Sequence, residues 1–440
     1  MQISSNIFGT DGIRGLTNSG YITPEHVTNL ALAAATYFDS KSENFTIVIG
    51  KDTRLSGYML ESALTAGFVS AGANVMLLGP IPTPAISMLT RSMRANLGVV
   101  ISASHNPYQD NGIKFFNSSG FKLSISDEQA ITDIFFRKNF KLASPEKLGK
   151  AKRIDDIDGR YVEFVKSSFK RNLKLFGVKI VIDSANGAAY KVAPEIFWEL
   201  GAEIIMVGNS PDGLNINAQC GATNTELLQK KVKENNADIG FALDGDADRL
   251  IIVDNNGEIL DGDYILAVIA TDWKNRGVLK GDNIVATKLS NTGLARYLES
   301  LGLHLETCDV GDRHVLETMF KKGANLGGEK SGHIVMTDYT TTGDGMIAAL
   351  QVLNYLVSNN KRSSEIKNLY KPYPQKFKNI YSEVDPNVEN IVKKISQNIL
   401  QERGRIIIRK SGTEDLTRIM IEAEDQKLID NSMDLLEPFC

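Results

Sequence analysis

Four short segments hold the side chains whose types and spacing could do chemistry. In the first, Asp244, Asp246 and Asp248 alternate directly after an apolar run, with Gly245 allowing a tight turn. Carboxylate oxygens at this spacing suit Mg²⁺, which takes a few carboxylates and completes its shell with water and phosphate oxygens. An EF-hand is excluded because Arg249 stands where that loop needs glycine. A solvated acidic turn is the alternative, and the preceding apolar run and following arginine favour a metal site.

The second segment, Ser102–Pro107, places hydroxyl groups beside His105, and Lys114 follows closely. Adjacent residues of an extended segment point apart, and the GxSxG elbow is absent around Ser104, so a serine-hydrolase geometry does not follow. The sequence also has no Walker A motif to indicate ATP held in a P-loop. What remains is a hydroxyl that could carry a phosphoryl group near a Mg²⁺ site and cations, as phosphoryl transfer requires.

The other two segments are Gly328–His333 and the C-terminal loop Arg409–Thr413, which Arg418 follows. The C-terminal loop offers backbone N–H groups, hydroxyls and guanidinium groups, which together can bind a phosphate. A polar hairpin turn is the alternative. The segment Gly343–Ala348 matches a dinucleotide fingerprint by letters only, since it follows three threonines and no strand, so bound NAD is not expected.

The elements that would position these segments recur along the chain. Runs rich in β-branched residues alternate with helical patterns, which is typical of βαβ units and a parallel sheet. Three copies of this order each reach a third strand that opens on similar letters: 95–98 (ANLG), 237–240 (ADIG) and 324–327 (ANLG). Six residues beyond the closing glycines lie Ser104, Asp246 and His333. Because ligands bind beyond the carboxyl ends of such strands, we predict three α/β copies that share one site.

The runs also predict individual elements. The first two strands of the three copies are expected at 45–49 and 74–78, at 178–182 and 203–207, and at 283–286 and 303–307. The tail differs, because it predicts a helix over 388–401 followed by two antiparallel strands, 405–409 and 418–422. We therefore expect a small α+β domain at the C-terminus, reached through a linker at 370–374.

Length and composition restrict the function classes. A chain of 440 residues predicts about three domains, and a net charge of -4 argues against nucleic-acid and membrane partners. Cys220, Cys308 and Cys440 show no CxxC spacing, which argues against disulfides and thiolate metal sites and fits a reducing cytoplasm. No export signal or membrane span is visible. The oligomeric state stays open, with a homodimer as the assembly considered.

Five segments resemble the signature loops of the α-D-phosphohexomutases, in the family's order and across essentially the whole chain. They are 8–15 (FGTDGIRG), 101–107 (ISASHNP), 244–249 (DGDADR), 327–333 (GGEKSGH) and 409–414 (RKSGTE). The resemblance implies three related α/β domains with mixed, mostly parallel sheets and a smaller C-terminal α+β domain around a central cleft. The expected domains are 1–153 with the phosphoserine loop, 154–258 with the metal loop, 259–370 with the sugar loop, and 371–440, which binds phosphate.

The resemblance also implies an activity. The forms of the early loop and the serine loop, together with Pro211–Asn217, indicate interconversion of glucosamine 6-phosphate and glucosamine 1-phosphate, for UDP-N-acetylglucosamine and cell-wall precursor synthesis. A glucose- or mannose-directed phosphomutase is the alternative enzyme. A catalytically silent sugar-phosphate-binding protein is the alternative from another class. An aspartyl-phosphate phosphatase fits less well, because Asp248 replaces the usual Thr or Val.

The same resemblance implies a role for each site residue. Ser104 would be a phosphoserine, and one Mg²⁺ would bind Asp244, Asp246, Asp248 and a phosphoryl oxygen on Ser104. The remaining catalytic residues would be Arg14, His105, Lys114 and Arg249, with Lys114 or His105 as the proton-transfer group. Sugar hydroxyls would contact Glu329 and Ser331, with His333 alongside. The non-reacting phosphate would bind Arg409, Ser411, Gly412, Thr413 and Arg418. A catalytic amount of glucosamine 1,6-bisphosphate or an equivalent would prime the serine, and the C-terminal domain would swing to open and close the cleft.

Three residues depart from the family's pattern. Ala247 stands where glycine is frequent, Lys330 where an uncharged residue is expected, and Asp415 where proline is common. Ala247 would restrict the metal loop only mildly. Lys330 would affect sugar preference, and Asp415 would affect the affinity for phosphate.

Overall fold

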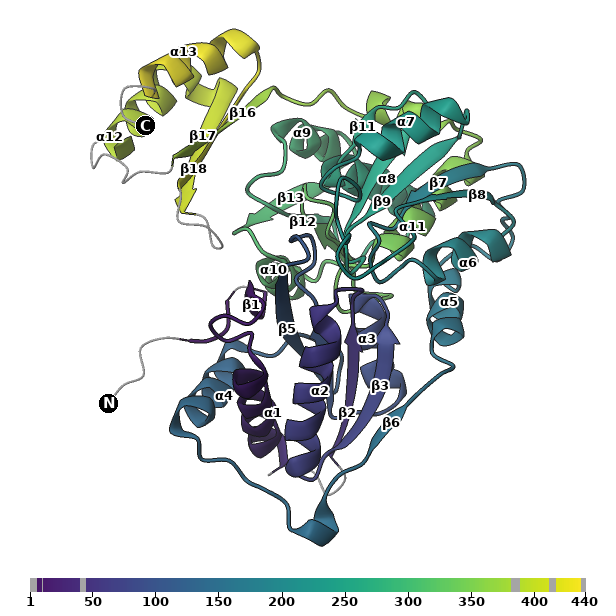
Figure 1. Cartoon of the computed structure of the whole chain (residues 1–440). Helices are drawn as coiled ribbons and strands as arrows, with labels where there is room; N and C mark the ends of the chain where they lie inside the picture. Colours follow the sequence, from purple (N-terminus) through teal and green to yellow (C-terminus); the bar gives the residue numbers. More distant parts are fainter. Residues whose placement is uncertain (1–5, 10, 40–44, 381–387, 411–416, 437–440) are drawn as a thin grey trace. The chain divides into compact units, whose positions relative to one another are not determined.

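A computed structural model describes residues 6–9, 11–39, 45–380, 388–410 and 417–436 (Figure 1). The chain divides into two compact units: residues 1–290 with 301–369, and residues 291–300 with 370–440. Among the described residues, the first unit contains three sheets and the second contains one. None of the described helices is both long enough and apolar enough to cross a membrane.

The first sheet has the order β1-β5-β4-β2-β3-β6. Its strands are β1 (Ile13–Leu16), β2 (Thr46–Lys51), β3 (Asn74–Pro80), β4 (Leu97–Ile101), β5 (Asp110–Asn117) and β6 (Ala151–Arg153). The associated helices are α1 (Pro24–Asp39), α2 (Ser56–Ser70), α3 (Thr83–Ser92) and α4 (Ile125–Arg137). Helix α1 buries Val27, Leu30, Ala31 and Ala34, the spacing of one helix face. The sheet is mixed, because β2 pairs in parallel with β3 and β4, whereas β5 runs antiparallel to β4 and β1.

The other two sheets of this unit have the orders β11-β10-β9-β7-β8 and β13-β12-β14-β15. The strands are β7 (Lys179–Asp183), β8 (Glu203–Val207), β9 (Ile239–Leu243), β10 (Leu250–Asp254), β11 (Ile259–Leu260), β12 (Asn283–Thr287), β13 (His304–Cys308), β14 (Leu326–Gly328) and β15 (Ile334–Met336). The helices are α5 (Asp158–Lys166), α6 (Val192–Glu199), α7 (Glu226–Glu234), α8 (Gly262–Arg276), α10 (Asp312–Lys322) and α11 (Gly345–Ser358).

The predicted repeat is confirmed by the strand orders. In each copy, the first strand lies between the second and third strands and pairs in parallel with both, as in β3-β2-β4, β8-β7-β9 and β13-β12-β14. Each third strand then pairs antiparallel with the strand that follows it. The loop between these last two strands is therefore the equivalent place in all three copies, and it carries Ser104, Asp246 and His333.

The glycines of the repeated four-residue opening have a packing role. A Cβ atom at Gly98 would lie 2.2 Å from Thr90 Oγ1, at Gly240 2.6 Å from Val232 Cγ2, and at Gly327 2.7 Å from Met319 Sδ. These neighbours belong to α3, α7 and α10, respectively. Glycine therefore lets a helix approach the third strand closely at the same place in every copy.

The second unit contains the sheet β16-β18-β17, in which both pairings are antiparallel. Its elements are α9 (Thr292–Ser300), β16 (Gln375–Ile380), α12 (Val388–Ile395), β17 (Gly404–Lys410), β18 (Thr417–Ala423) and α13 (Gln426–Leu436). The two predicted tail strands are confirmed within β17 and β18. The predicted helix over 388–401 is α-helical only to Ile395, after which Ser396–Leu400 form one turn of π-helix.

The predicted linker at 370–374 makes specific contacts within the second unit. Asn291 Nδ2 donates to Tyr373 O at 2.9 Å, and Tyr373 N–H donates to Asn291 Oδ1 at 2.8 Å. Two hydrogen bonds from one side chain therefore fix the backbone of this segment against the start of α9.

Candidate active site

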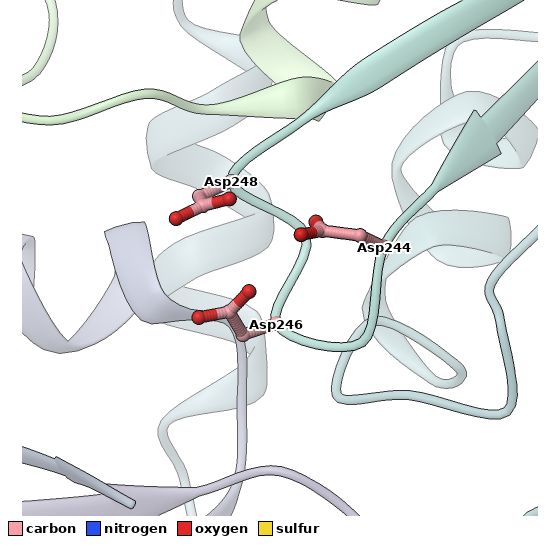
Figure 2. A group of neighbouring side chains, drawn as sticks. All are labelled: Asp244, Asp246 and Asp248. Atoms are coloured by element: carbon pink, nitrogen blue, oxygen red, sulfur yellow. The ribbon is translucent and has the colours of Figure 1, made fainter. Parts of the chain in front are cut away.

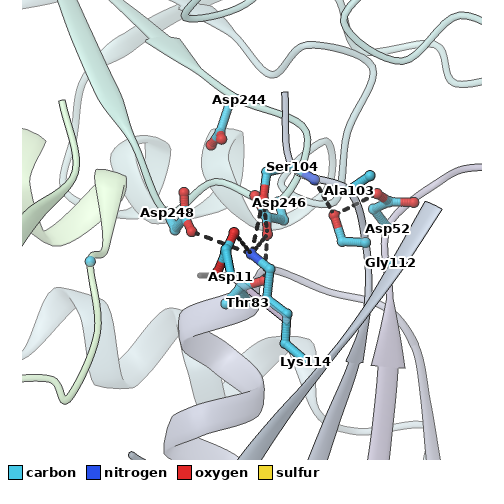
Figure 3. Close-up of polar contacts among 12 residues, drawn as sticks. Asp11, Asp52, Thr83, Ala103, Ser104, Gly112, Lys114, Asp244, Asp246 and Asp248 are labelled. Atoms are coloured by element: carbon cyan, nitrogen blue, oxygen red, sulfur yellow. Dashed lines mark hydrogen bonds and ion pairs between the residues drawn. The ribbon is translucent and has the colours of Figure 1, made fainter. Parts of the chain in front are cut away.

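The loop after β4 holds Ser104 in a defined orientation. The residue is 1% exposed and has a φ of 49°, which lies in the left-handed region that non-glycine residues seldom adopt. Ser104 Oγ donates to Asp246 Oδ2 at 3.0 Å. It also accepts hydrogen bonds from Lys114 Nζ at 2.9 Å and Arg14 Nη2 at 3.0 Å. The structure thus brings four of the predicted site residues together at one hydroxyl oxygen. Figure 3 shows three of them, Ser104, Lys114 and Asp246.

The loop between β9 and β10 holds three carboxylates that face one another (Figure 2). Asp244, Asp246 and Asp248 are buried, and one ligand atom from each lies within 4.8 Å of the others. Among their buried oxygens, Asp244 Oδ2, Asp246 Oδ1 and Asp248 Oδ1 have no hydrogen-bond partner. Buried carboxylate oxygens without donors fit a hard divalent cation such as Mg²⁺, so the residues present match the predicted metal.

Backbone geometry forms this metal loop. A Cβ atom at Gly245 would lie 2.5 Å from Ser104 O, so the glycine lets the metal loop approach the serine loop. Ala247 is wholly buried and has a φ of 59°. The departure from glycine therefore falls on a left-handed position, which costs about 1–2 kcal/mol in an L-residue.

The carboxylates of the metal loop have pKa values shifted in opposite directions. Burial would raise the pKa of Asp246, but Lys114 and a hydrogen bond from Thr83 outweigh burial and lower the pKa. Burial and the neighbouring carboxylates Asp248 and Asp246 raise the pKa of Asp244 well above its usual value. The triad is thus under mutual repulsion that a bound cation would relieve.

Lys114, on β5, joins the serine loop to the carboxylates. Its Nζ lies 3.0 Å from Asp246 Oδ2, 3.8 Å from Asp248 Oδ2 and 3.2 Å from Asp11 Oδ2. Burial alone would lower the pKa of Lys114, but Asp11, Asp246 and Asp248 outweigh it and raise the pKa. The ammonium group is therefore charged at neutral pH and lies directly against Ser104 Oγ.

The neighbouring His105 has the opposite electrostatic setting. Burial, followed by the positive charges of Arg249 and Arg14, lowers the pKa of His105 to about 3. Its Nδ1 is buried without a hydrogen-bond partner. The imidazole is therefore neutral in the unphosphorylated protein. Arg249 lies close to the triad, with Nε 3.9 Å from Asp244 Oδ2 and 4.0 Å from Asp248 Oδ1.

The loop between β14 and β15 carries the predicted sugar-binding residues. Glu329 Oε1 accepts the Gly311 N–H at 2.8 Å, and Ser331 Oγ donates to Glu329 Oε2 at 3.2 Å. His333 Nε2 accepts the Gly343 N–H at 3.3 Å and lies 3.9 Å from Asp248 Oδ2. His333 therefore adjoins the metal loop, while Glu329 and Ser331 form one hydrogen-bonded group. Lys330 Nζ lies 3.6 Å from Asp261 Oδ2, so a carboxylate neighbours the extra positive charge of this loop.

The predicted phosphate-binding residues belong to the second unit. Arg409 on β17 and Arg418 on β18 are directly opposite each other in the antiparallel register. Ser411, Gly412 and Thr413 lie outside the described residues, as does Asp415. Directly opposed residues of neighbouring antiparallel strands have their side chains on the same face of the sheet, so Arg409 and Arg418 are cross-strand neighbours.

Sequence reasoning missed several residues of the site. Asp11 forms ion pairs with Arg14, Lys114 and Lys122. It lies inside the quoted segment 8–15 (FGTDGIRG), and a carboxylate among cationic candidates was the available signal. Thr83 Oγ1 donates to Asp246 Oδ2 at 2.8 Å. Thr83 is 163 residues from Asp246, and no local pattern signals that contact.

Comparisons with known proteins place the chain in a family. Four models of phosphoglucomutase/phosphomannomutase domains match in order: alpha/beta/alpha domain I at residues 5–142, domain II at 159–257, domain III at 261–373, and the C-terminal domain at 358–436. A phosphoglucosamine mutase of Zymomonas mobilis is 53% identical over 436 residues, covering 98% of each chain. A phosphoglucosamine mutase of Parvibaculum lavamentivorans is 54% identical over 430 residues, covering 96% of this chain and 95% of its own.

Solved structures show the same fold. A phosphoglucomutase/phosphomannomutase family protein of Burkholderia thailandensis superposes with a TM-score of 0.83 at 24% identity, covering 99% of this chain and 98% of its own. An Aspergillus fumigatus N-acetylphosphoglucosamine mutase, solved in complex with GlcNAc-6P and magnesium, has a TM-score of 0.67 at 18% identity and covers 98% and 94%. By its four matched domains and its full-length relatives, the chain belongs to the phosphoglucomutase/phosphomannomutase family, the α-D-phosphohexomutases.

Proposed function

We propose that the chain is a phosphoglucosamine mutase that interconverts glucosamine 6-phosphate and glucosamine 1-phosphate through a phosphoserine at Ser104. The observation that carries the proposal is the setting of Ser104 Oγ, which Lys114 Nζ and Arg14 Nη2 contact at 2.9 and 3.0 Å. A phosphoryl group on this oxygen would lie among cations at the edge of the carboxylate triad, as phosphoryl transfer needs. Relatives named phosphoglucosamine mutase, at 50–54% identity, support the choice of sugar.

The residues proposed to hold one Mg²⁺ are Asp244, Asp246 and Asp248, with a phosphoryl oxygen on Ser104 as a further ligand. When bound, the ion would offset the negative charge of the transferring phosphoryl group. The three unpartnered carboxylate oxygens support this assignment. Arg249 would assist from the side of the triad, where its Nε lies within 4.0 Å of two of the carboxylates.

Two half-reactions use the same serine. In the first, the bond between phosphorus and the Ser104 oxygen breaks and a bond from phosphorus to O1 of glucosamine 6-phosphate forms. O1 loses its proton, and the released serine oxygen gains one. Lys114 and Arg14 donate hydrogen bonds to the serine oxygen as negative charge develops on it. Lys114 and His105 are the two candidates for moving the proton, and Lys114 contacts the serine oxygen directly.

The glucosamine 1,6-bisphosphate then turns, and its O6 phosphoryl group returns to Ser104, leaving glucosamine 1-phosphate. Glu329 and Ser331, with His333 alongside, are proposed to bind the sugar hydroxyls in both orientations. Arg409, Ser411, Gly412, Thr413 and Arg418 are proposed to bind the phosphate that is not transferred. A catalytic amount of the bisphosphate or an equivalent would prime the unphosphorylated serine.

The proposal assigns these parts to four domains, 1–153, 154–258, 259–370 and 371–440. The matched family domains have similar centres along the chain, which supports the division. We further propose that the product serves UDP-N-acetylglucosamine and cell-wall precursor synthesis, as expected of an enzyme that supplies glucosamine 1-phosphate.

A coupled assay tests the proposed function. Purified protein with Mg²⁺ and a trace of bisphosphate should convert glucosamine 6-phosphate with a higher kcat/KM than glucose or mannose phosphates. Ser104→Ala should abolish turnover, whereas Ser118→Ala, an exposed serine of the same domain, should leave it unchanged. Near wild-type turnover by Ser104→Ala would refute the phosphoserine, and a preference for glucose or mannose phosphates would refute the substrate.

A further inference from the structure

A buried arginine supports the serine loop from within the first domain. Arg54 follows β2 and has 0% of its surface exposed, so each of its N–H groups needs an acceptor. Its Nε donates to Asp52 Oδ2 at 2.8 Å. The remaining four N–H groups donate to backbone carbonyls of the serine loop and the residues after it: Asp110 O at 3.1 Å, Ser104 O at 3.1 Å, Asn106 O at 2.8 Å, and Pro107 O. All five guanidinium donors are therefore used.

Asp52 extends this contact to the backbone N–H of Ser104. Its Oδ2 accepts the Ser102 hydroxyl at 2.7 Å, and Ser102 Oγ in turn accepts the Ser104 N–H at 2.9 Å. Asp52, Ser102 and Arg54 are each at most 1% exposed. Both the N–H and the C=O of Ser104 are thus fixed by one buried network (Figure 3 shows the Asp52 side).

Asn217 contacts the same loop from the segment between β8 and α7. Its Nδ2 donates to Ser104 O at 2.8 Å and to Asn106 O at 3.0 Å. These are two of the carbonyls that Arg54 also contacts. A carbonyl oxygen can accept two hydrogen bonds, so Arg54 and Asn217 can both donate to the carbonyl oxygens of Ser104 and Asn106. The serine loop is therefore held by one residue from each of the first two proposed domains.

Ser104 needs such support because of its backbone conformation. A φ of 49° in a serine is unfavourable by about 1–3 kcal/mol and persists where surrounding contacts over-determine it. We infer that Arg54 is a positioning residue for phosphoryl transfer: assisted by Asp52 and Asn217, it holds Ser104 in the conformation that directs Oγ toward Asp246, Lys114 and Arg14. This inference rests on the proposed function, because it concerns the serine that is proposed to carry the phosphoryl group.

Arg54→Lys tests the geometry while keeping the positive charge. A lysine offers three donors on one atom, so it cannot reach four carbonyls and Asp52 together. We expect kcat on glucosamine 6-phosphate to fall on the order of 100-fold, the size of effect that a displacement of about 1 Å can produce. KM should change by less than about threefold, because the sugar-binding residues are untouched.

Lys51→Met is the matched control. Lys51 precedes Arg54 by three residues, is 2% exposed, and pairs with Glu61 Oε2 at 2.7 Å. Its substitution should lower the melting temperature and leave kcat unchanged. The readout specific to positioning is the single-turnover rate at which labelled bisphosphate phosphorylates Ser104, which should fall in Arg54→Lys and not in Lys51→Met.

Ser102→Ala provides the decisive variant if Arg54→Lys does not fold. It removes the acceptor of the Ser104 N–H and the hydroxyl that donates to Asp52 Oδ2, and leaves Arg54 in place. It should slow Ser104 phosphorylation on the order of tenfold, less than the roughly 100-fold effect that a displacement of about 1 Å can produce. A folded Arg54→Lys, or in its absence Ser102→Ala, that phosphorylates Ser104 within about threefold of the wild-type rate would overturn the inference. If the wild-type protein itself is never phosphorylated at Ser104, the proposed function fails, and the inference fails with it.

Discussion

At the residue scale, the site concentrates charge of both signs around one hydroxyl. Lys114 Nζ contacts Ser104 Oγ and Asp246 Oδ2 at 2.9 and 3.0 Å, while each of the three aspartates keeps one buried oxygen without a hydrogen-bond partner. The network neutralises Asp246 well and leaves the other two carboxylates poorly compensated. A protein with a net charge of -4 can therefore still present cations locally to an anionic substrate.

Asp244→Asn should separate the destabilisation that the three buried carboxylates cause from their role in binding Mg²⁺. Without metal, the variant should melt at or above the wild-type temperature, because it removes one of three buried, mutually repelling carboxylates. Saturating Mg²⁺ should raise the melting temperature of the wild type and not that of the variant, since only the wild type binds the ion. Differential scanning fluorimetry with and without Mg²⁺ measures both effects.

Asp254→Asn is the control for this experiment. Asp254 is buried on β10 outside the triad, and its Oδ1 accepts the N–H groups of Asn256 and Glu258, each at 2.9 Å. The Asp254→Asn variant should be stabilised by Mg²⁺ as much as the wild type is. A full Mg²⁺ response in Asp244→Asn would contradict the assignment of the metal site.

Asp183, at the end of β7, should make stability depend on pH. Burial raises the pKa of Asp183 from 3.8 to about 6, although the Gly221 and Ala185 N–H groups favour its charged form. Because the folded pKa is the higher one, the native state holds this proton more tightly. The resulting stabilisation is complete below about pH 4 and is lost as the pH rises through about 6.

Melting temperatures of wild type and Asp183→Asn between pH 4 and 7 test this dependence. The wild type should lose stability relative to the variant as the pH rises through that window. The exposed Asp155 supplies the control, because Asp155→Asn retains Asp183 and should therefore lose stability with rising pH as the wild type does. A constant difference between wild type and Asp183→Asn would show that the Asp183 pKa is ordinary.

At the element scale, the three α/β copies share a close approach of helix to strand. Gly240→Val should lower stability by about 1–3 kcal/mol through overpacking, because even a Cβ atom at Gly240 would lie 2.6 Å from Val232 Cγ2. Glu203→Val, at an exposed position on β8 of the same sheet, should change stability little. Thermal melting checks both variants. An unchanged midpoint for Gly240→Val would show that the space between α7 and β9 can accommodate a larger side chain.

Much of this element order could be predicted from the sequence. The β-branched runs and repeated glycines predicted the strands of each copy, because strand formation and close packing leave local signals. The π-helical turn after Ile395 was missed, because the helical sequence pattern predicted over 388–401 continues through it without a break. Contacts such as Thr83 with Asp246 were also missed, because they depend on which copies lie side by side.

At the scale of the whole first unit, Lys122 connects two of the α/β copies. It pairs with Asp11 beside the serine site and with Asp312 at the start of α10. Lys122→Met should lower stability by about 1–3 kcal/mol, less than for a fully buried pair, because two carboxylates that are 29% and 13% exposed lose their shared cation. Adding Asp312→Asn should recover part of this loss, which a double-mutant cycle measures.

The surface pair Lys280–Asp338 serves as the reference for that cycle. Lys280 is 65% exposed, and Lys280→Met should cost no more than about 1 kcal/mol. Additive effects of Lys122→Met and Asp312→Asn would contradict a direct coupling between these two copies.

The most direct test of the central claim locates the phosphoryl group. The protein is incubated with Mg²⁺ and bisphosphate labelled in its phosphoryl groups, digested, and mapped by mass spectrometry, and the labelled protein is then chased with glucosamine 6-phosphate. The account predicts label on Ser104 that transfers to the sugar at a rate compatible with turnover. Label on Asp244, or turnover while Ser104 remains unlabelled, would contradict it.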